Sequence, residues 1–171
     1  VNRCLNGYFR RRLLHDRNQA LAQAAAVTTV SPWHVQILKA YNPHAHLIYN
    51  GYDPELFYPE HLLSKRFTIT YTGRLLSLAL RDPSLLLAAI QRLDQAQAIQ
   101  PDTFQVAWYT DDASKALIEQ EADRFGVSAY MDYRGYMPAS EIPRVLNQSC
   151  VLLLLTNKAE KEKLQGIMTT K

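Results

Sequence analysis

The second half of the chain alternates between two hydrophobic patterns. Four short stretches rich in β-branched, aromatic and aliphatic residues span positions 67–72, 104–110, 129–134 and 150–155. Between them, residues 83–97, 113–125 and 141–147 carry apolar side chains at helical spacing. This alternation predicts an α/β fold, a parallel sheet flanked by helices on both faces. The last strand is nearly all apolar, which predicts burial on both faces, including the Cys150 thiol.

The first third of the chain repeats the alternation on a smaller scale. The pattern predicts a helix over residues 8–26, a strand over 27–30, a helix over 31–41 and a strand over 46–49. Ser31 and Pro32 are residue types favoured at an N-cap and at the first helical position. Residues 50–66 contain Pro54 and Pro59 and show little periodicity, so we interpret them as a linker at a domain boundary.

Composition narrows the classes of protein. The chain has 171 residues, 47% of them hydrophobic and 20% charged, which fits a globular protein with a sizeable core. A net charge of only +3 does not predict a nucleic-acid-binding surface. Two distant cysteines form no disulfide framework, which favours a reducing, cytoplasmic compartment. The longest apolar run is far shorter than the roughly 20 residues of a membrane span. Because the chain begins at Val1 and stops at Lys171, we expect both ends to be cut from a longer protein.

The residues that follow each predicted strand are the main candidates for chemistry, because open parallel sheets bind ligands at the carboxyl ends of their strands. These residues are Gly73-Arg74, Asp111-Asp112, Gly135-Tyr136-Met137 and Thr156-Asn157. We expect Asp112 and Ser140 to cap the helices that follow. Glycine allows close approach of the backbone to a ligand, and Arg74 with Arg81 has the charge to neutralise a diphosphate. The alternative is two solvated arginines beside an ordinary turn.

Two further segments extend this candidate site. Gly135, Tyr136 and Met137 have the groups to frame a flat base, or they form a simple turn. Residues 166–171 have the composition of a loop before a helix, with phosphate contacts from backbone N–H groups and Lys171, or they are a disordered end. Arg10, Arg11 and Arg12 form a basic patch on a predicted helix, suited to anionic lipid or to solvent.

Several familiar motifs are missing from the sequence. There is no Asp-x-Asp pair for a metal–nucleotide complex, no Gly-x-Gly-x-x-Gly for a dinucleotide and no Walker-type Gly-Lys-Ser/Thr. The five histidines lack metal-ligand spacing. These absences weigh against NAD or FAD binding, against an NTPase and against a resident metal.

The order of the motifs resembles a known family. Residues 25–31, then Ile48-Tyr49-Asn50-Gly51, then Tyr71-Thr72-Gly73-Arg74-Leu75 are similar to the middle of a family 4 glycosyltransferase, a retaining enzyme with the GT-B fold. Residues 81–86, 135–138, 152–157 and 166–171 fit the same series. The resemblance runs through almost the whole chain, and its specificity lies in the order and spacing of motifs that are each weak alone.

The resemblance implies two Rossmann-like domains. Residues 1–58 would be the end of the acceptor domain plus a linker, and residues 59–171 the first half of the nucleotide-sugar domain. The donor would be a nucleotide-diphosphate sugar, without a metal or other cofactor. Arg74 matches the family arginine, and Arg81 lies near the place of a second cation that is usually Lys. The carboxylates that contact the donor sugar would follow Lys171.

The implied function is transfer of the sugar to a glycan or lipid-linked acceptor in bacterial polysaccharide synthesis, with the chain alone inactive. The implied location is the cytoplasm, with peripheral contact at the inner face of the membrane as an option. The alternatives are a nucleotide-sugar epimerase and a GT-B segment that only binds. The sugar, the base, the acceptor and the oligomeric state stay open.

Overall fold

The chain forms two compact units. The computed structural model describes residues 3–60 and 64–155, and the division falls between Gly51 and Tyr52. We call residues 3–51 the N-terminal unit and the described residues from 52 onwards the C-terminal unit. Residues 52–60, which the sequence predicts to be part of a linker, belong to the C-terminal unit. There, the Asn147 side chain donates to the Tyr58 carbonyl at 2.9 Å and accepts from the Glu60 N–H at 3.2 Å.

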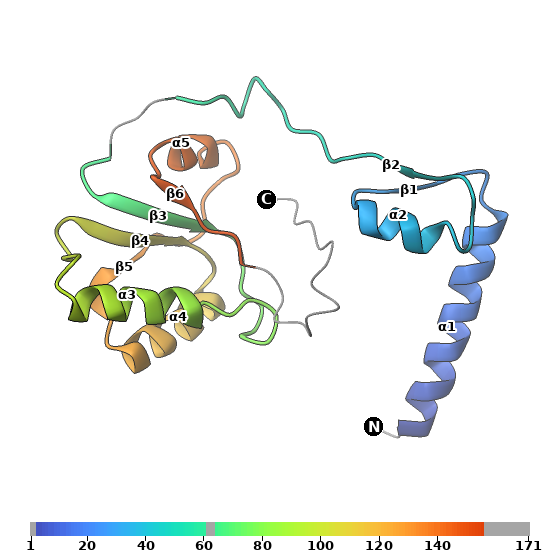
Figure 1. Ribbon diagram of the computed structural model, residues 1–171, viewed down its shortest axis with the longest axis horizontal. Helices are drawn as coiled ribbons and strands as arrows, with labels where there is room; N and C mark the ends of the chain where they lie inside the picture. The colour runs from blue at the N-terminus through green and yellow to red at the C-terminus, as the bar shows by residue number, and fades with distance from the viewer. Residues whose placement is uncertain (1–2, 61–63, 156–171) are drawn as a thin grey trace. The chain divides into compact units, whose positions relative to one another are not determined.

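The N-terminal unit is a pair of parallel strands with two helices (Figure 1). Its elements are α1 (Arg3–Gln23), β1 (Val27–Thr29), α2 (Pro32–Leu38) and β2 (Ala45–Leu47). β1 and β2 pair from Val27 opposite Ala45 to Thr29 opposite Leu47. Ser31 and Pro32 take the N-cap and first helical positions of α2, as predicted. α2 is shorter than predicted, because the chain turns after Leu38.

One buried amide fixes the end of α1. The Asn42 side chain donates to the carbonyls of Leu21 and Ala24 at 2.8 and 2.7 Å, and it accepts from the His44 N–H at 2.8 Å. The last carbonyls of a helix have no partner within the helix. Asn42 supplies partners from the turn before β2, and it thereby ties α1 to the strand pair.

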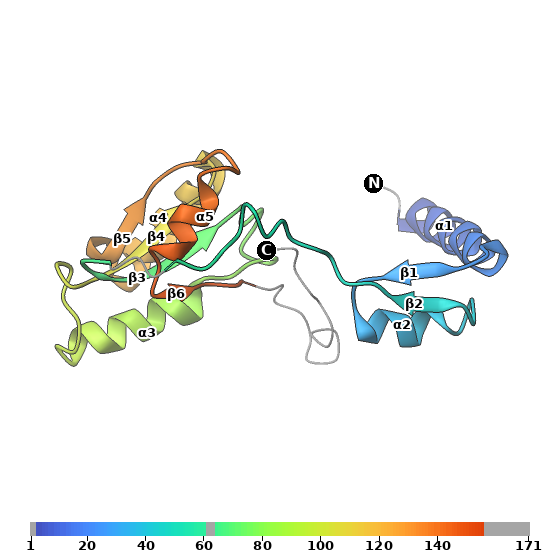
Figure 2. The same cartoon turned by 90° about the horizontal axis from the view of Figure 1, so that it is seen from above.

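The C-terminal unit is a four-stranded sheet in the order β5-β4-β3-β6, with every pairing parallel. Its strands are β3 (Phe67–Thr72), β4 (Phe104–Tyr109), β5 (Met131–Tyr133) and β6 (Val151–Leu152). Its helices are α3 (Ser84–Gln95), α4 (Asp112–Phe125), a single 3-10 turn (Ser128–Tyr130) and α5 (Ile142–Asn147). α5 lies on one face of the sheet, and α3 and α4 lie on the other (Figures 1 and 2). The predicted α/β fold is confirmed.

The apolar core lies between the sheet and the pair α3 and α4. Tyr71, Val106 and Trp108 are fully buried and alternate along β3 and β4, so they share the face that packs against Ile90 and Ile118. The Tyr71 and Trp108 rings lie 5.4 Å apart. Gly126 ends α4 in the left-handed conformation, with φ at 68°.

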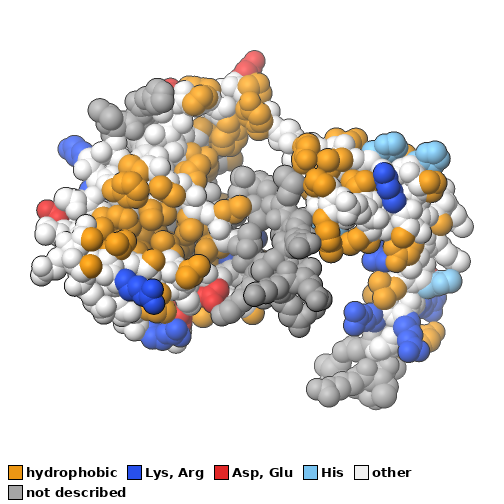
Figure 3. Space-filling view, in the orientation of Figure 1, with side chains coloured by type: hydrophobic (Ala, Val, Ile, Leu, Met, Phe, Trp, Pro, Cys, Tyr) orange, Lys and Arg blue, Asp and Glu red, His pale blue; other side chains and the backbone are white. Residues whose placement is uncertain are grey.

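The expected burial of the last strand holds for Leu155, which is buried, and in part for Leu153, but it is wrong for the residues that form the strand. Only Val151 and Leu152 pair with β3, and both side chains are exposed, as are Leu154 and the Cys150 thiol. β6 lies at the edge of the sheet, where one side of the strand has no neighbour among the described residues. Figure 3 shows apolar side chains gathered over β6 and α3. Phe67, also expected to be buried, is half exposed at the first position of β3.

Candidate functional site

The candidate site lies at the carboxyl edge of the sheet in the C-terminal unit. β3, β4 and β5 are adjacent and parallel, so the turns that follow them lie at the same edge. Gly73 follows β3 with φ at 124°, a backbone conformation that favours glycine, and its N–H donates to the Tyr109 carbonyl at 2.9 Å. The turn therefore leaves the sheet with its backbone close to the end of β4.

Arg74 extends from this turn and forms an ion pair with Asp111. Its Nε lies 2.9 Å from Asp111 Oδ2, and 58% of its side chain is exposed. Asp111 is also the N-cap of α4, since its Oδ1 accepts from the Ser114 N–H at 3.1 Å. Hydrogen bonds from Ser114 and the Arg74 charge hold the pKa of Asp111 below its usual range. A carboxylate ion is thus fixed beside the guanidinium.

Three further hydrogen bonds hold the backbone of the Arg74 turn. The Tyr71 hydroxyl donates to the Arg74 carbonyl at 3.0 Å, and the Arg81 guanidinium donates to the same oxygen. The Leu75 N–H donates to Ser114 Oγ at 2.9 Å, and the Leu75 side chain is fully buried. Leu76, with φ at 66°, continues the turn in a conformation that is uncommon for leucine. The turn is therefore pinned to both β3 and α4.

A hollow of about 290 Å³ opens beside this turn. Thr72 lines it at the end of β3, Gly73 from the turn that follows, Tyr109 from β4, and Tyr136 and Met137 from the turn after β5. Gly135 begins that last turn with φ at 70°. Ligand pockets in proteins usually measure about 300–1,000 Å³, so this hollow has room for one part of a ligand. An aromatic ring and a thioether on its wall suit a flat group such as a base.

The structure brings together most of the residues predicted for the site. Gly73, which directly precedes Arg74, lines the hollow together with Tyr136 and Met137. Arg81 reaches the same turn, where its guanidinium donates to the Arg74 carbonyl. Lys171 lies outside the described residues, and so do Thr156, Asn157 and the whole loop 166–170.

The sequence predicts that Asp111 lies near the site, because it follows a strand. It does not predict the contacts of Asp111 with Arg74 and with Ser114. The expected cap of α4, Asp112, is wrong by one residue, because the helix begins at Asp112 and Asp111 is its cap. The residue before α5 is Glu141 rather than Ser140, and it makes no side-chain cap bond. Two consecutive aspartates at the start of a predicted helix indicate that either one can be its N-cap.

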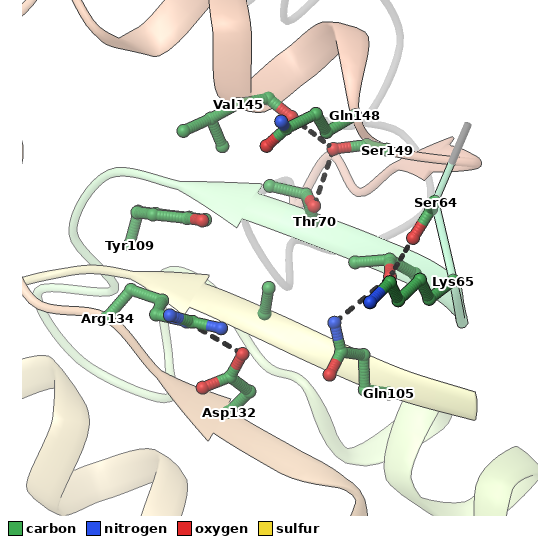
Figure 4. Close-up of a pocket in the computed structure, with 12 residues that line it drawn as sticks. Ser64, Lys65, Thr70, Gln105, Tyr109, Asp132, Arg134, Val145, Gln148 and Ser149 are labelled. Atoms are coloured by element: carbon green, nitrogen blue, oxygen red, sulfur yellow. Dashed lines mark hydrogen bonds and ion pairs between the residues drawn. The ribbon is translucent and has the colours of Figure 1, made fainter. Parts of the chain in front are cut away.

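A second, polar hollow of about 360 Å³ lies on the α5 face of the sheet (Figure 4). Its polar groups bond to one another: Ser149 Oγ donates to Thr70 Oγ1 at 2.6 Å, and Arg134 Nε lies 2.8 Å from Asp132 Oδ2. That bond with Asp132 raises the pKa of Arg134. Tyr109 lines both hollows, so the two adjoin at the end of β4.

The described residues contain neither a metal-site cluster nor a membrane-spanning helix. In residues 3–60 and 64–155, no group of three or more His, Cys, Asp or Glu side chains has the arrangement of a metal site. No helix in the same residues is both long and apolar enough to cross a membrane.

Comparison with known proteins gives structural relatives only. No protein-family model matches the chain, and no curated protein matches it in sequence. Sucrose-phosphate synthase from Thermosynechococcus elongatus has 18% identity and a TM-score of 0.62, over 80% of this chain and 36% of that one. HepE from Anabaena, solved with UDP and glucose, has 15% identity and a TM-score of 0.55, over 75% and 37%.

The lipopolysaccharide outer core galactosyltransferase WaaB has 15% identity and a TM-score of 0.56, over 80% of this chain and 38% of that one. The chain thus spans little more than a third of each of these three proteins. The fold is that of part of a GT-B glycosyltransferase, with Rossmann-like parallel sheets.

Proposed function

We propose that this chain is part of a glycosyltransferase that takes its sugar from a nucleotide-diphosphate sugar, with residues 1–58 from the end of the acceptor domain and residues 59–171 from the donor-binding domain. The observation that carries the proposal is the Arg74 turn beside an apolar-walled hollow, at the carboxyl edge of a GT-B-like sheet. A diphosphate needs fixed positive charge and a close backbone, and a base needs a flat wall. Gly73, Arg74, Tyr136 and Met137 offer all three within neighbouring turns.

Each residue takes one part of the ligand in this proposal. Gly73 lets the backbone approach the diphosphate, and the Arg74 guanidinium binds its oxygens and stabilises the charge that develops when the sugar leaves. Tyr136 and Met137 contact the base at the turn that Gly135 opens. Arg81 acts mainly through the Arg74 carbonyl that it contacts, and it adds longer-range positive charge. Lys171 is retained as a proposed phosphate contact on sequence grounds alone.

The finer parts of the proposal rest on the resemblance and on what the relatives are. We propose UDP as the nucleotide, because HepE was solved with UDP. We propose a retaining, metal-independent, family 4 transfer in the cytoplasm. A glycan or lipid-linked acceptor in bacterial polysaccharide synthesis is proposed because WaaB acts in the lipopolysaccharide outer core.

The direct test is titration of the 171-residue chain with UDP and with GDP, followed by amide NMR shifts at low and high salt. We expect weak, saturable binding of UDP, near millimolar, that weakens with salt because an exposed guanidinium is screened. Shifts should concentrate in the turns after β3 and β5. An Arg74→Ala variant should lose roughly tenfold in affinity, and Arg74→Lys should recover part of it.

The matched control is Arg92→Ala, which removes the same charge from an exposed position in the last turn of α3. That turn leads toward the amino edge of the sheet, so the variant should bind UDP as the parent chain does. The proposal fails if UDP does not bind, or if Arg74→Ala binds it as well as the parent.

A further inference from the structure

The contacts of Asp111 have a consequence for the donor site. We propose that Asp111 is a positioning residue, which holds the Arg74 guanidinium through an ion pair on its Nε side so that both Nη groups remain available for phosphate oxygens. This inference rests on the proposed function. It assigns to Asp111 a role in ligand binding beyond that of a helix cap.

Asp111 uses its two oxygens on different partners. Oδ1 accepts the Ser114 N–H at 3.1 Å, and Oδ2 lies 2.9 Å from Arg74 Nε. The first bond fixes the carboxylate to the start of a 14-residue helix. The ion pair at Oδ2 extends that fixed position to Arg74, so α4 orients the guanidinium although 58% of the Arg74 side chain is exposed.

The backbone of Arg74 is held by the same helix turn. Ser114, whose N–H is capped by Asp111, also accepts the Leu75 N–H through its Oγ at 2.9 Å. Asp111 and Ser114 therefore hold the Arg74 turn at two points, the side chain and the main chain. A free arginine has many rotamers to lose when it binds a ligand, and a prepositioned one loses fewer.

The carboxylate also repels an incoming phosphate, and the geometry explains how both effects coexist. Arginine has five N–H donors in a planar fork, so one edge can bond to a carboxylate while the remaining donors face elsewhere. A lysine ammonium has no such division, because its charge is concentrated at one atom. With Lys at position 74, Asp111 would only neutralise the cation that the phosphate needs.

This difference yields a test with two backgrounds. Asn is as good an N-cap as Asp, so Asp111→Asn keeps α4 capped while it removes the charge that holds Nε. In the Arg74 chain, Asp111→Asn should weaken UDP binding by roughly threefold, the scale of a partly exposed ion pair. In the Arg74→Lys chain, the same substitution should leave UDP binding unchanged or tighten it. A purely structural role of Asp111 would weaken binding equally in both backgrounds.

A second readout follows the contact itself. The Arg74 Nε signal, assigned by its loss in Arg74→Lys, should show by NMR relaxation a more mobile side chain in Asp111→Asn than in the parent chain, because the ion pair that holds it is lost. Asp112→Asn is the matched control, because Asp112 is exposed, carries the same charge and appears in none of the ion pairs of the described residues. It should change neither UDP affinity nor the mobility of the Arg74 side chain.

The outcomes separate this inference from the proposed function. If Arg74→Ala weakens UDP binding while Asp111→Asn has the same effect in both backgrounds, the positioning role is wrong and the donor site stands. If UDP does not bind, or Arg74→Ala has no effect, both are wrong. Should Asp111→Asn fail to fold, Asp111→Ser keeps a capping hydroxyl without the charge, and the same reversal between backgrounds is expected.

Discussion

Tyr71, Val106 and Trp108 are fully buried in the central strands of the C-terminal unit, whereas Ala45 is the one buried hydrophobic side chain described in the N-terminal unit. Both units pair parallel strands joined through a helix, so the local pattern is the same. What differs is the number of elements that cover each strand. β3 and β4 have neighbours on both sides, and α3 and α4 cover one face. The stability of a strand pair with fewer packed elements around it depends more on individual hydrogen bonds.

The difference places the candidate site on the better packed unit. The Arg74 turn is anchored by Tyr71, which belongs to the main core, and by the buried Ser114 in the first turn of α4. In the N-terminal unit, by contrast, Tyr8, Phe9 and Leu13 are exposed on α1 together with three consecutive arginines. The N-terminal unit therefore presents exposed apolar and basic side chains, whereas the C-terminal unit holds the residues of the candidate site through its buried core.

The largest effect is expected from the core of the C-terminal unit. Trp108→Ala removes a fully buried ring that packs on Tyr71, and it should lower the free energy of unfolding of this unit by about 3–5 kcal/mol. Urea unfolding followed by circular dichroism measures the change. Trp33→Ala is the control in the N-terminal unit, where the side chain is only partly buried, and it should cost far less. Equal losses from the two tryptophans would contradict the contrast between the units.

The next largest effect is expected from Asn42 in the N-terminal unit. Asn42→Ala leaves the carbonyls of Leu21 and Ala24 without their partner, at a cost of about 1–3 kcal/mol. Hydrogen exchange of the Val27 and Ile48 amides, which bond within this unit, should accelerate, while exchange in β3 and β4 stays unchanged. Asn42→Asp keeps the acceptor for the His44 N–H but loses both donors, so it should not rescue the unit.

The sequence predicts the regular elements of the C-terminal unit closely and its edges poorly. β3 matches its predicted range, because β-branched and aromatic residues favour strands wherever they pack. The apolar run from residue 150 also favours a strand, but whether that strand is buried depends on neighbours outside the run. An edge position cannot be read from local composition.

The same limit applies to the candidate site. The sequence predicts that Gly73 and Arg74 follow a strand, since glycine and arginine interrupt an apolar run. The sequence does not show which aspartate caps α4, because Asp111 and Asp112 are adjacent and are equally good N-caps. The bond from Arg81 to the Arg74 carbonyl joins residues of a loop whose path is set by the buried Leu75. Such a contact depends on packing that sequence spacing does not give.

A smaller effect concerns the exposed surface of α1. We propose that its arginines and exposed aromatic residues bind anionic membrane lipid, in line with a location at the inner face of the membrane. Arg11→Gln should weaken sedimentation with phosphatidylserine-containing vesicles by about 1 kcal/mol, close to fivefold. Arg92→Gln, the same change in the C-terminal unit, should have no effect. Binding that is equal on neutral vesicles would rule out the electrostatic part of the proposal.

The smallest effect is expected from lowering the pH, which protonates Asp111 in the candidate site. Because folding holds the pKa of Asp111 below its usual range, its ionised form stabilises the folded state above the ordinary aspartate pKa of about 3.9. That contribution is lost as the pH falls below this value and through the folded pKa. Carboxyl carbon shifts followed by NMR from pH 6 downward should show Asp111 titrating at lower pH than a free aspartate. In Arg74→Ala the midpoint should rise only in part, because the hydrogen bonds from Ser114 are the larger cause of the lowered pKa and remain. A midpoint at the ordinary value in the parent chain would mean that neither Ser114 nor Arg74 holds the carboxylate in solution.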